Sequence, residues 1–122
     1  MPDDKLLLVV EDEPLIALAL QDALEGAGYR VLIAEDGLTG AAALARSMQE
    51  VSALITDIRL GSGPNGWRLA WQARAKCPAL PVLYVTGDSA HEWSRHGVPG
   101  SVLLQKPFAP TRMLAELSTI LH

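Results

Sequence analysis

The sequence is poor in cysteine, aromatic residues, long apolar runs and positive charge. These absences are typical of a small domain in a reducing compartment. It contains one cysteine, Cys77, which cannot form a disulfide within the chain, and only 5% of its residues are aromatic. No apolar run approaches the roughly 20 residues that a bilayer-spanning helix needs. The acidic start at residues 1–4 lacks the positive charge of a signal peptide, and a net charge of −4 provides no basic footprint for nucleic acid. We therefore expect a soluble cytoplasmic domain that binds neither nucleic acid nor membrane directly.

The chain does have enough apolar material for a core: its 122 residues are 49% hydrophobic and 20% charged, which excludes disorder as the main state. Short apolar segments alternate with amphipathic ones along its whole length. This pattern predicts strands at residues 5–10, 30–34, 52–57, 81–86 and 101–105, and helices at 12–24, 37–48, 67–76, 88–96 and 109–121. Such alternation is typical of an α/β fold in which helices cover both faces of a parallel sheet. No linker or repeat interrupts it, so residues 1–122 are predicted to form a single domain.

Charged and hydroxyl side chains stand at the ends of four predicted strands. Glu11 and Asp12 follow the first strand, Asp57 ends the third, Thr86 ends the fourth and Lys106 follows the fifth. Taken singly, each has an ordinary structural explanation: Asp12 is expected to cap the first helix, and Thr86 suits a cap of the next helix. The carboxyl ends of parallel strands meet at one edge, however, and ligands bind there in open α/β sheets. We therefore predict that these five side chains converge on one site.

The predicted site combines three carboxylates with an ammonium group and a hydroxyl. Two carboxylates about 4 Å apart repel each other by roughly 4 kcal/mol at an effective dielectric constant near 20, so three of them must take up protons or bind a cation. Ligands that are all oxygens favour Mg²⁺. A bound Mg²⁺ next to a lysine and a hydroxyl is suited to a phosphoryl group, and a carboxylate can accept that group as an aspartyl phosphate. The residues therefore predict Mg²⁺-dependent phosphoryl transfer to an aspartate.

Four segments, taken together, resemble the receiver domain of two-component response regulators. They are LLLVVEDEP at 6–14, LITD at 54–57, PVLYVTG at 81–87 and LLQKPF at 103–108. The resemblance covers essentially the whole chain, and the order and spacing of the set make it specific. It implies a flavodoxin-like (βα)5 fold with strand order 2-1-3-4-5, of the single-domain type. It also implies that the protein is a phosphoacceptor switch and not an enzyme. Such a switch catalyses only its own phosphorylation and dephosphorylation.

The resemblance implies a role for each acidic residue of the predicted site. Asp57 is implied as the phosphoacceptor and as one ligand of Mg²⁺, for which Mn²⁺ can substitute. Asp12 is implied as a direct metal ligand, Glu11 as a ligand acting mainly through water, and Arg59 as a ligand through its backbone carbonyl.

Other positions are implied to bind the phosphoryl group or to control its loss. Thr86 would hydrogen-bond a phosphoryl oxygen and move when it arrives, and Lys106 would pair with another oxygen. The Lys106–Pro107 peptide bond is expected to be cis, which is a rare geometry. Arg59 and Asp88 hold positions that influence how fast the phosphoryl group is lost to water. We hypothesise that they form an ion pair that hinders this water.

The sequence departs from the usual family pattern in the region that transmits the switch. Leu103 stands three residues before the lysine, where the family commonly has an aromatic residue. The stretch 81–87 partly resembles the PFxFATG subgroup of receivers, with Tyr84 at its second aromatic position. The loop after Asp57 is one residue longer than usual, and the glycines and proline within 88–100 predict a short, mobile segment.

The resemblance also implies partners. The phosphodonor would be a histidine kinase or a histidine phosphotransfer protein. The output would be a protein contact through the face formed by the fourth helix, fifth strand and fifth helix, made by a monomer or weak dimer, with Trp93 as the docking candidate. Trp67 and Trp71 share a helix face and are predicted to pack against the sheet or its edge.

The sequence is also compatible with functions other than a phosphorylated single-domain receiver. Two alternatives remain open: a receiver that docks without phosphorylation, and a receiver module of a hybrid histidine kinase. A phosphatase of the haloacid dehalogenase type is disfavoured, because Arg59 stands where that family needs a second aspartate.

Overall fold

Five short apolar segments form one parallel sheet in the computed structural model, which describes residues 5–121; the acidic start at 1–4 lies outside the described residues. The strands are β1 (Leu6–Val10), β2 (Arg30–Ala34), β3 (Val51–Asp57), β4 (Val82–Thr86) and β5 (Val102–Gln105). They pair in the order β2-β1-β3-β4-β5, which confirms the predicted topology. The three central strands are buried on both faces, and this explains why their sequences are continuous apolar runs.

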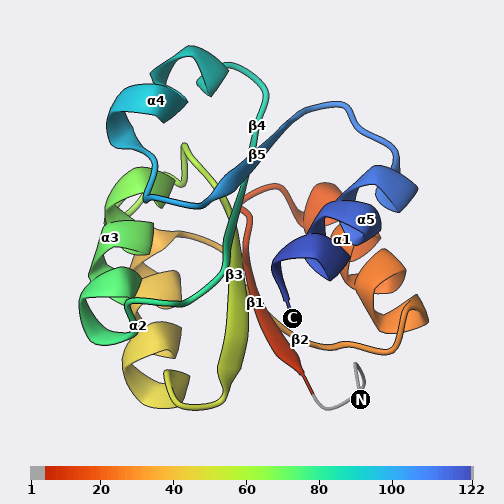
Figure 1. Ribbon diagram of the computed structural model, residues 1–122, viewed down its shortest axis with the longest axis horizontal. Helices are drawn as coiled ribbons and strands as arrows, with labels where there is room; N and C mark the ends of the chain where they lie inside the picture. Colours follow the sequence, from red (N-terminus) through yellow and green to blue (C-terminus); the bar gives the residue numbers. More distant parts are fainter. Residues whose placement is uncertain (1–4, 122) are drawn as a thin grey trace.

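Helices cover both faces of the sheet and create two separate cores. The helical elements are α1 (Pro14–Gly26), α2 (Gly37–Ser47), α3 (Gly66–Lys76), the 3-10 turn η2 (Ala90–Glu92), α4 (Trp93–His96) and α5 (Pro110–Ile120). One apolar cluster lies between the sheet and α2 and α3, and the other lies between the sheet and α1 and α5. In Figure 1 these pairs flank the sheet on its left and right, and α4 lies above α3.

The structure corrects the predictions for two helices. The first helix begins at Pro14 with Glu13 in the capping position, so Asp12 is not its cap. The reason is local: the Glu11 carboxylate accepts the Glu13 N–H at 3.2 Å and shapes this turn. The predicted helix at 88–96 is instead η2 followed by the single turn of α4. Here the Thr86 hydroxyl accepts the N–H of Ser89 at 2.9 Å, which holds residues 87–89 in a turn. The other bounds agree with the predictions to within two residues.

The start of α3 is packed directly against the end of β3. The Gly66 N–H donates to the Ile58 carbonyl at 2.8 Å. A Cβ atom on Gly66 would collide with the backbone carbonyl of Asp57, so only glycine permits this approach. Asn65 caps the helix by accepting the Arg68 N–H at 2.9 Å. The end of β3, and the acidic residue that stands there, are thereby fixed against α3.

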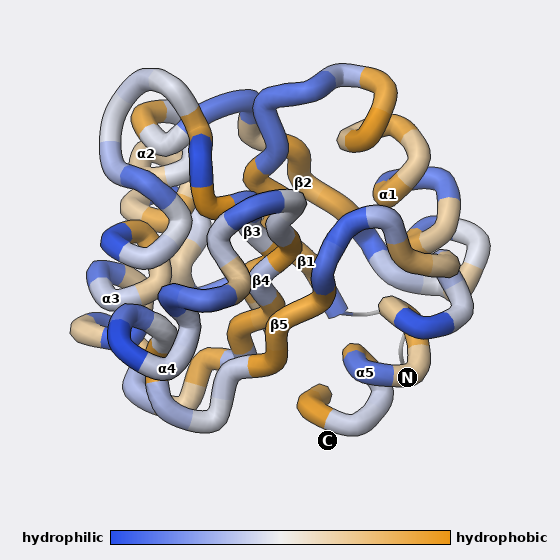
Figure 2. Tube along the Cα trace, turned by 90° about the horizontal axis from the view of Figure 1, so that it is seen from above, coloured by the Kyte–Doolittle hydropathy of each residue, from blue (hydrophilic) through white to orange (hydrophobic). Residues whose placement is uncertain are grey.

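Hydrophilic loops surround the apolar strands when the molecule is viewed from above (Figure 2). None of the helices within residues 5–121 combines the length and the apolar character that crossing a bilayer requires.

Candidate functional site

Three carboxylates from β1 and β3 come together at the carboxyl edge of the sheet. Val10 of β1 is paired with Thr56 of β3, so the residues that follow each strand lie side by side. One oxygen each from Glu11, Asp12 and Asp57 lies within 4.8 Å of the others. Glu11 and Asp57 are buried, whereas Asp12 is exposed to solvent. The structure thus brings together the acidic side chains that the sequence predicted to converge.

Lys106 supplies the positive charge that this cluster needs. Its Nζ donates to Glu11 Oε1 and to Asp57 Oδ2, in each case at 2.9 Å. Its backbone N–H donates to the Thr86 carbonyl at 2.7 Å, which ties the ends of β4 and β5 together. The Lys106–Pro107 peptide bond is cis, as expected. The ammonium group therefore lies between two carboxylates that would otherwise repel each other.

Burial and hydrogen bonding shift the pKa values of Glu11 and Lys106 in opposite directions. Burial raises the pKa of Glu11 to about 7, although the hydrogen bond from Lys106 opposes this rise. Burial alone would lower the pKa of Lys106, but its hydrogen bonds to Asp57 and Glu11 outweigh that effect and raise the pKa. The lysine therefore stays charged at neutral pH, while Glu11 exchanges its proton near neutrality.

The oxygen donors of the site fit Mg²⁺. Carboxylates from three residues suit a hard cation, and exposure of Asp12 leaves room for the waters that Mg²⁺ keeps. Asp57 Oδ1 accepts the Ile58 N–H at 2.6 Å, and Oδ2 accepts from the lysine, so the orientation of this carboxylate is fixed. No buried polar side-chain atom among residues 5–121 lacks a hydrogen-bond partner. Lys106 is a hydrogen-bond donor to both buried carboxylates of the cluster, those of Glu11 and Asp57.

Thr86 lies at the end of β4 with its hydroxyl turned toward the loop that follows. This oxygen accepts the N–H groups of Ser89 at 2.9 Å and Asp88 at 3.2 Å. Ser89 is buried, and its own hydroxyl donates to Asp88 Oδ1 at 2.9 Å. Sequence analysis missed the role of Ser89 in this turn; the only signal was its place three residues after a threonine, the spacing of a hydroxyl-capped turn.

The ion pair that we hypothesised across the mouth of the site is present. Arg59 Nε lies 3.1 Å from Asp88 Oδ2. Both side chains are largely exposed, so the pair contributes little to stability. It does link the loop after Asp57 to the loop after Thr86.

A second polar network, which sequence analysis did not predict, joins β4 to the segment around α4. Tyr84 is buried, and its phenolic oxygen accepts the Val98 N–H at 3.1 Å. The Trp67 ring packs on it with centroids 4.7 Å apart. Leu103, which replaces the family's usual aromatic residue, is the neighbour of Tyr84 on β5. The sequence signal for this network was the tyrosine within the apolar run at 81–86. A buried tyrosine hydroxyl normally needs a hydrogen-bond partner, so this residue indicated one.

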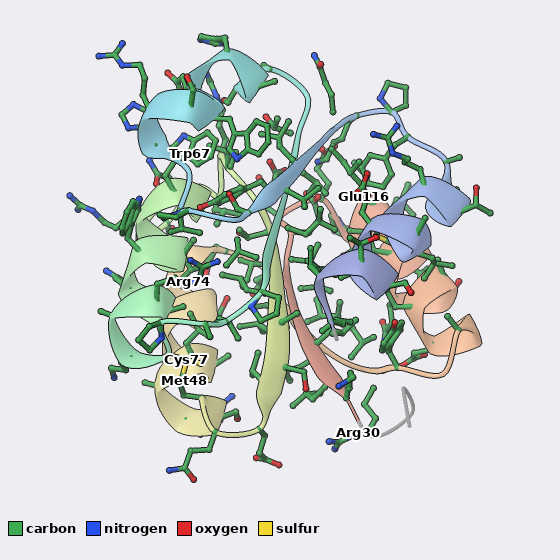
Figure 3. All side chains as sticks on the ribbon, viewed as in Figure 1. Arg30, Met48, Trp67, Arg74, Cys77 and Glu116 are labelled. Carbon is green, nitrogen blue, oxygen red and sulfur yellow. The ribbon has the colours of Figure 1, made fainter. Side chains whose placement is uncertain are left out.

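The three tryptophans differ in exposure. Trp67 is buried between α3 and the sheet, which confirms its predicted packing, and Figure 3 shows it beneath α4. The same prediction is wrong for Trp71, which is half-exposed because its ring faces the segment around α4, where its Nε1 donates to the His96 carbonyl at 2.8 Å. Trp93 is 39% exposed, and its Nε1 donates to Ser101 Oγ at 3.0 Å. Part of the Trp93 ring is therefore accessible to a partner.

Comparison with known sequences places these features in one family. The family model for the response regulator receiver domain matches residues 7–118. The phyllosphere-induced regulator PhyR of Methylorubrum extorquens is 30% identical over 115 residues, which cover 94% of this chain and 43% of that protein. The transcriptional regulatory protein CusR of Escherichia coli K12 is 33% identical over 121 residues, covering 95% and 51%. The chain thus spans about half the length of these curated relatives.

Solved structures agree with this placement. A response regulator receiver protein from Sinorhizobium medicae superposes with a TM-score of 0.91 at 32% identity, covering 96% of this chain and 94% of that one. The chemotaxis protein CheY4 of Vibrio cholerae gives a TM-score of 0.85 at 26% identity, covering 96% and 98%. The family match and these superpositions show that the chain belongs to the response regulator receiver domains of two-component systems, which are phosphoacceptor switches.

Proposed function

We propose that this receiver accepts one phosphoryl group from a phosphohistidine onto Asp57, in a reaction that depends on Mg²⁺. The observation that carries the proposal is the arrangement of Glu11, Asp12 and Asp57 within 4.8 Å of one another, with Lys106 Nζ 2.9 Å from Asp57. A carboxylate oriented at the end of a strand, beside a lysine and a cluster of metal-ligating oxygens, is suited to attack phosphorus.

The transfer uses the residues of this site in distinct ways. An Asp57 carboxylate oxygen attacks phosphorus, and the bond between phosphorus and the donor imidazole breaks, with its electron pair returning to the ring nitrogen. Lys106 exchanges its contact with Asp57 for one with a phosphoryl oxygen. A bound Mg²⁺, held by Asp12, Asp57 and the Arg59 carbonyl, and by Glu11 through water, would neutralise further phosphoryl charge.

Switching follows from the position of the Thr86 hydroxyl. That hydroxyl supports the turn at Asp88 and Ser89 in the present structure. When it turns to a phosphoryl oxygen, the two N–H groups lose their acceptor and the turn loses a support. The turn leads into η2 and α4, so phosphorylation would shift the population of conformations around Trp93 and the α4–β5–α5 face, where a target protein would dock.

A protein donor also needs a surface next to Asp57. Leu15 on α1 is 81% exposed and Leu18 is 53% exposed. An apolar groove of about 310 Å³ runs from Leu15 to Pro107 and Phe108, beside Lys106. We place the donor kinase or phosphotransfer protein on this surface. The encounter would occur in the cytoplasm, in keeping with the free thiol of Cys77.

Incubation with acetyl phosphate and Mg²⁺, followed by intact-mass measurement, tests the proposal. We expect the protein to gain the mass of one phosphoryl group when Mg²⁺ is present. It should gain no mass when a chelator is added beforehand. Small donors fail on some receivers, so the assay is repeated with phosphorylated histidine kinases. A protein that gains no phosphate from either source would instead be a docking module.

Magnesium binding is expected to depend on the proton held by Glu11. The metal favours the ionised carboxylate, and burial raises the pKa of Glu11 to about 7. Affinity for Mg²⁺ should therefore be about tenfold higher at pH 8 than at pH 6, as measured by calorimetry. Glu11→Gln should remove this dependence; equal affinity of the wild type at both pH values would contradict it.

The raised pKa of Glu11 also makes the folding stability of the metal-free protein depend on pH. Without metal, folded Glu11 retains a proton between pH 4.5 and about 7 that the unfolded chain has released. Stability contributed by this group therefore falls as pH rises through that range.

The phosphoryl group is expected to be lost faster in Asp88→Ala, because removal of the Arg59–Asp88 ion pair opens the mouth of the site to water. An exposed pair is worth at most about 1 kcal/mol, so the half-life should shorten by no more than roughly fivefold. Arg59→Ala should have the same effect, and the double variant should add nothing. An unchanged half-life in Asp88→Ala would remove the hypothesis.

A further inference from the structure

A groove of about 840 Å³ lies between α3 and α4 and has no part in the phosphoryl site described above. Its lining includes Trp71 and Arg68 from α3, and Glu92, Arg95 and His96 from the segment after β4. Figures 1 and 2 both show α4 beside the N-terminal end of α3.

The two walls of this groove are fastened together by side chains from one stripe of α3. Trp67 Nε1 donates to Glu92 Oε1 at 3.4 Å, and Trp71 Nε1 donates to the His96 carbonyl at 2.8 Å. One turn further along, Arg74 Nη1 donates to the Pro99 carbonyl at 2.8 Å. These positions lie on the same helix face. The segment 92–99, which contains the short helix α4, is therefore held on α3 by three hydrogen bonds, and the groove is preformed.

Charge on the chain is strongly uneven, and the groove lies in its basic part. Residues 59–100 contain five of the ten Lys and Arg residues but only two of the fourteen Asp and Glu residues. Arg59 and Arg112 have carboxylate partners. Arg68 and Arg95 are exposed, and neither takes part in any ion pair found within residues 5–121.

We propose that the α3–α4 groove binds an acidic segment of a partner protein. Arg68 and Arg95 would pair with its carboxylates, and the half-exposed Trp71 ring, which also lines the groove, would pack against an apolar side chain. Aromatic residues and arginines are the side chains that most often dominate binding at protein interfaces. The surface differs from the α4–β5–α5 face, because its other wall is α3, and the binding does not require a phosphoryl group.

A nucleic acid is a poorer fit to the same surface. Affinity for nucleic acid comes mainly from several phosphate contacts, and this groove offers two arginines next to the carboxylate of Glu92. The chain as a whole carries a charge of −4 and repels a long polyanion. A short acidic segment with apolar side chains avoids both penalties.

Titration of ¹⁵N-labelled protein with a capped hexapeptide of alternating glutamate and leucine tests this proposal. The buffer has low salt and no Mg²⁺, which the peptide would chelate. We expect saturable shifts of the Trp71 indole N–H and of the Arg95 and His96 backbone N–H signals. The peptide with glutamine in place of glutamate should cause none. Arg68→Glu and Arg95→Glu should each weaken binding by about tenfold.

Arg46→Glu on α2 is the matched control, because Arg46 is exposed and lies outside the groove. It should change affinity by less than about twofold. The amide spectrum of each variant establishes that it is folded. Three results would overturn the proposal: no saturable shift with the acidic peptide, equal weakening by Arg46→Glu, or tighter binding of a charge-matched oligonucleotide at the same signals.

Discussion

Asp57→Asn is expected to abolish the phosphoryl adduct completely, because the amide has no nucleophilic oxygen of comparable strength. Asparagine has nearly the same shape, and its carbonyl oxygen can still accept the Ile58 N–H that Asp57 Oδ1 accepts at 2.6 Å. The variant should therefore fold normally and fail only in the chemistry. Intact mass after incubation with acetyl phosphate and Mg²⁺, or with a phosphorylated kinase, measures the effect.

Asp22→Asn is the matched control, since Asp22 is an exposed aspartate of α1 outside the acidic cluster. It should gain one phosphoryl group like the wild type. If Asp57→Asn also gained the group, another residue would be the acceptor and the proposed role of Asp57 would be wrong. Loss of the adduct in both variants would show an effect of charge rather than of the nucleophile.

The sequence predicted the sheet well because its strands are buried on both faces. The apolar runs that end at Val10, Asp57 and Thr86 have few other ways to be buried, and parallel strands bring their ends to one edge. The convergence of Glu11, Asp57 and Lys106 followed from that topology alone. The role of each residue came from the motif resemblance, because topology alone brings the side chains together without assigning their chemistry.

The region after β4 was predicted less well, because tertiary contacts shape it more than local propensity does. Residues 88–96 form η2 and one turn of α4, held by donors from α3 and by the hydroxyl of Thr86. Donors 25 residues away in the chain leave no local pattern. The bond from Val98 to Tyr84 is likewise invisible in the spacing of the sequence.

The position of Asp12 shows that the buried Glu11 carboxylate overrides a local preference for a helix cap. An aspartate two residues before Pro14 suits a helix cap, yet the structure gives that position to Glu13. The buried Glu11 carboxylate takes the N–H of Glu13, and Asp12 is left exposed at the acidic cluster. A local preference was overridden here at a candidate functional site.

Lys106→Met is expected to destabilise the metal-free protein at pH 8 by about 3 kcal/mol. Methionine preserves the unbranched stem beside Pro107 and Phe108 in the apolar groove but removes the ammonium group. The Lys106 side chain is only 17% exposed, and Glu11 is fully buried, so the two carboxylates that it bridges would lose their nearby positive charge. Urea denaturation, with and without Mg²⁺, measures this loss.

Two features of the result distinguish lost charge from lost packing. At pH 5 the Glu11 carboxyl is protonated, because its pKa is raised to about 7, so the cost of the substitution should shrink. Mg²⁺ at pH 8 should restore part of the stability by replacing the missing positive charge. Lys76→Met, at an exposed lysine of α3, should have little effect at either pH. A loss in Lys106→Met that is equal at pH 5 and pH 8 and insensitive to Mg²⁺ would mean that the lysine stem, rather than its charge, holds this edge of the sheet together.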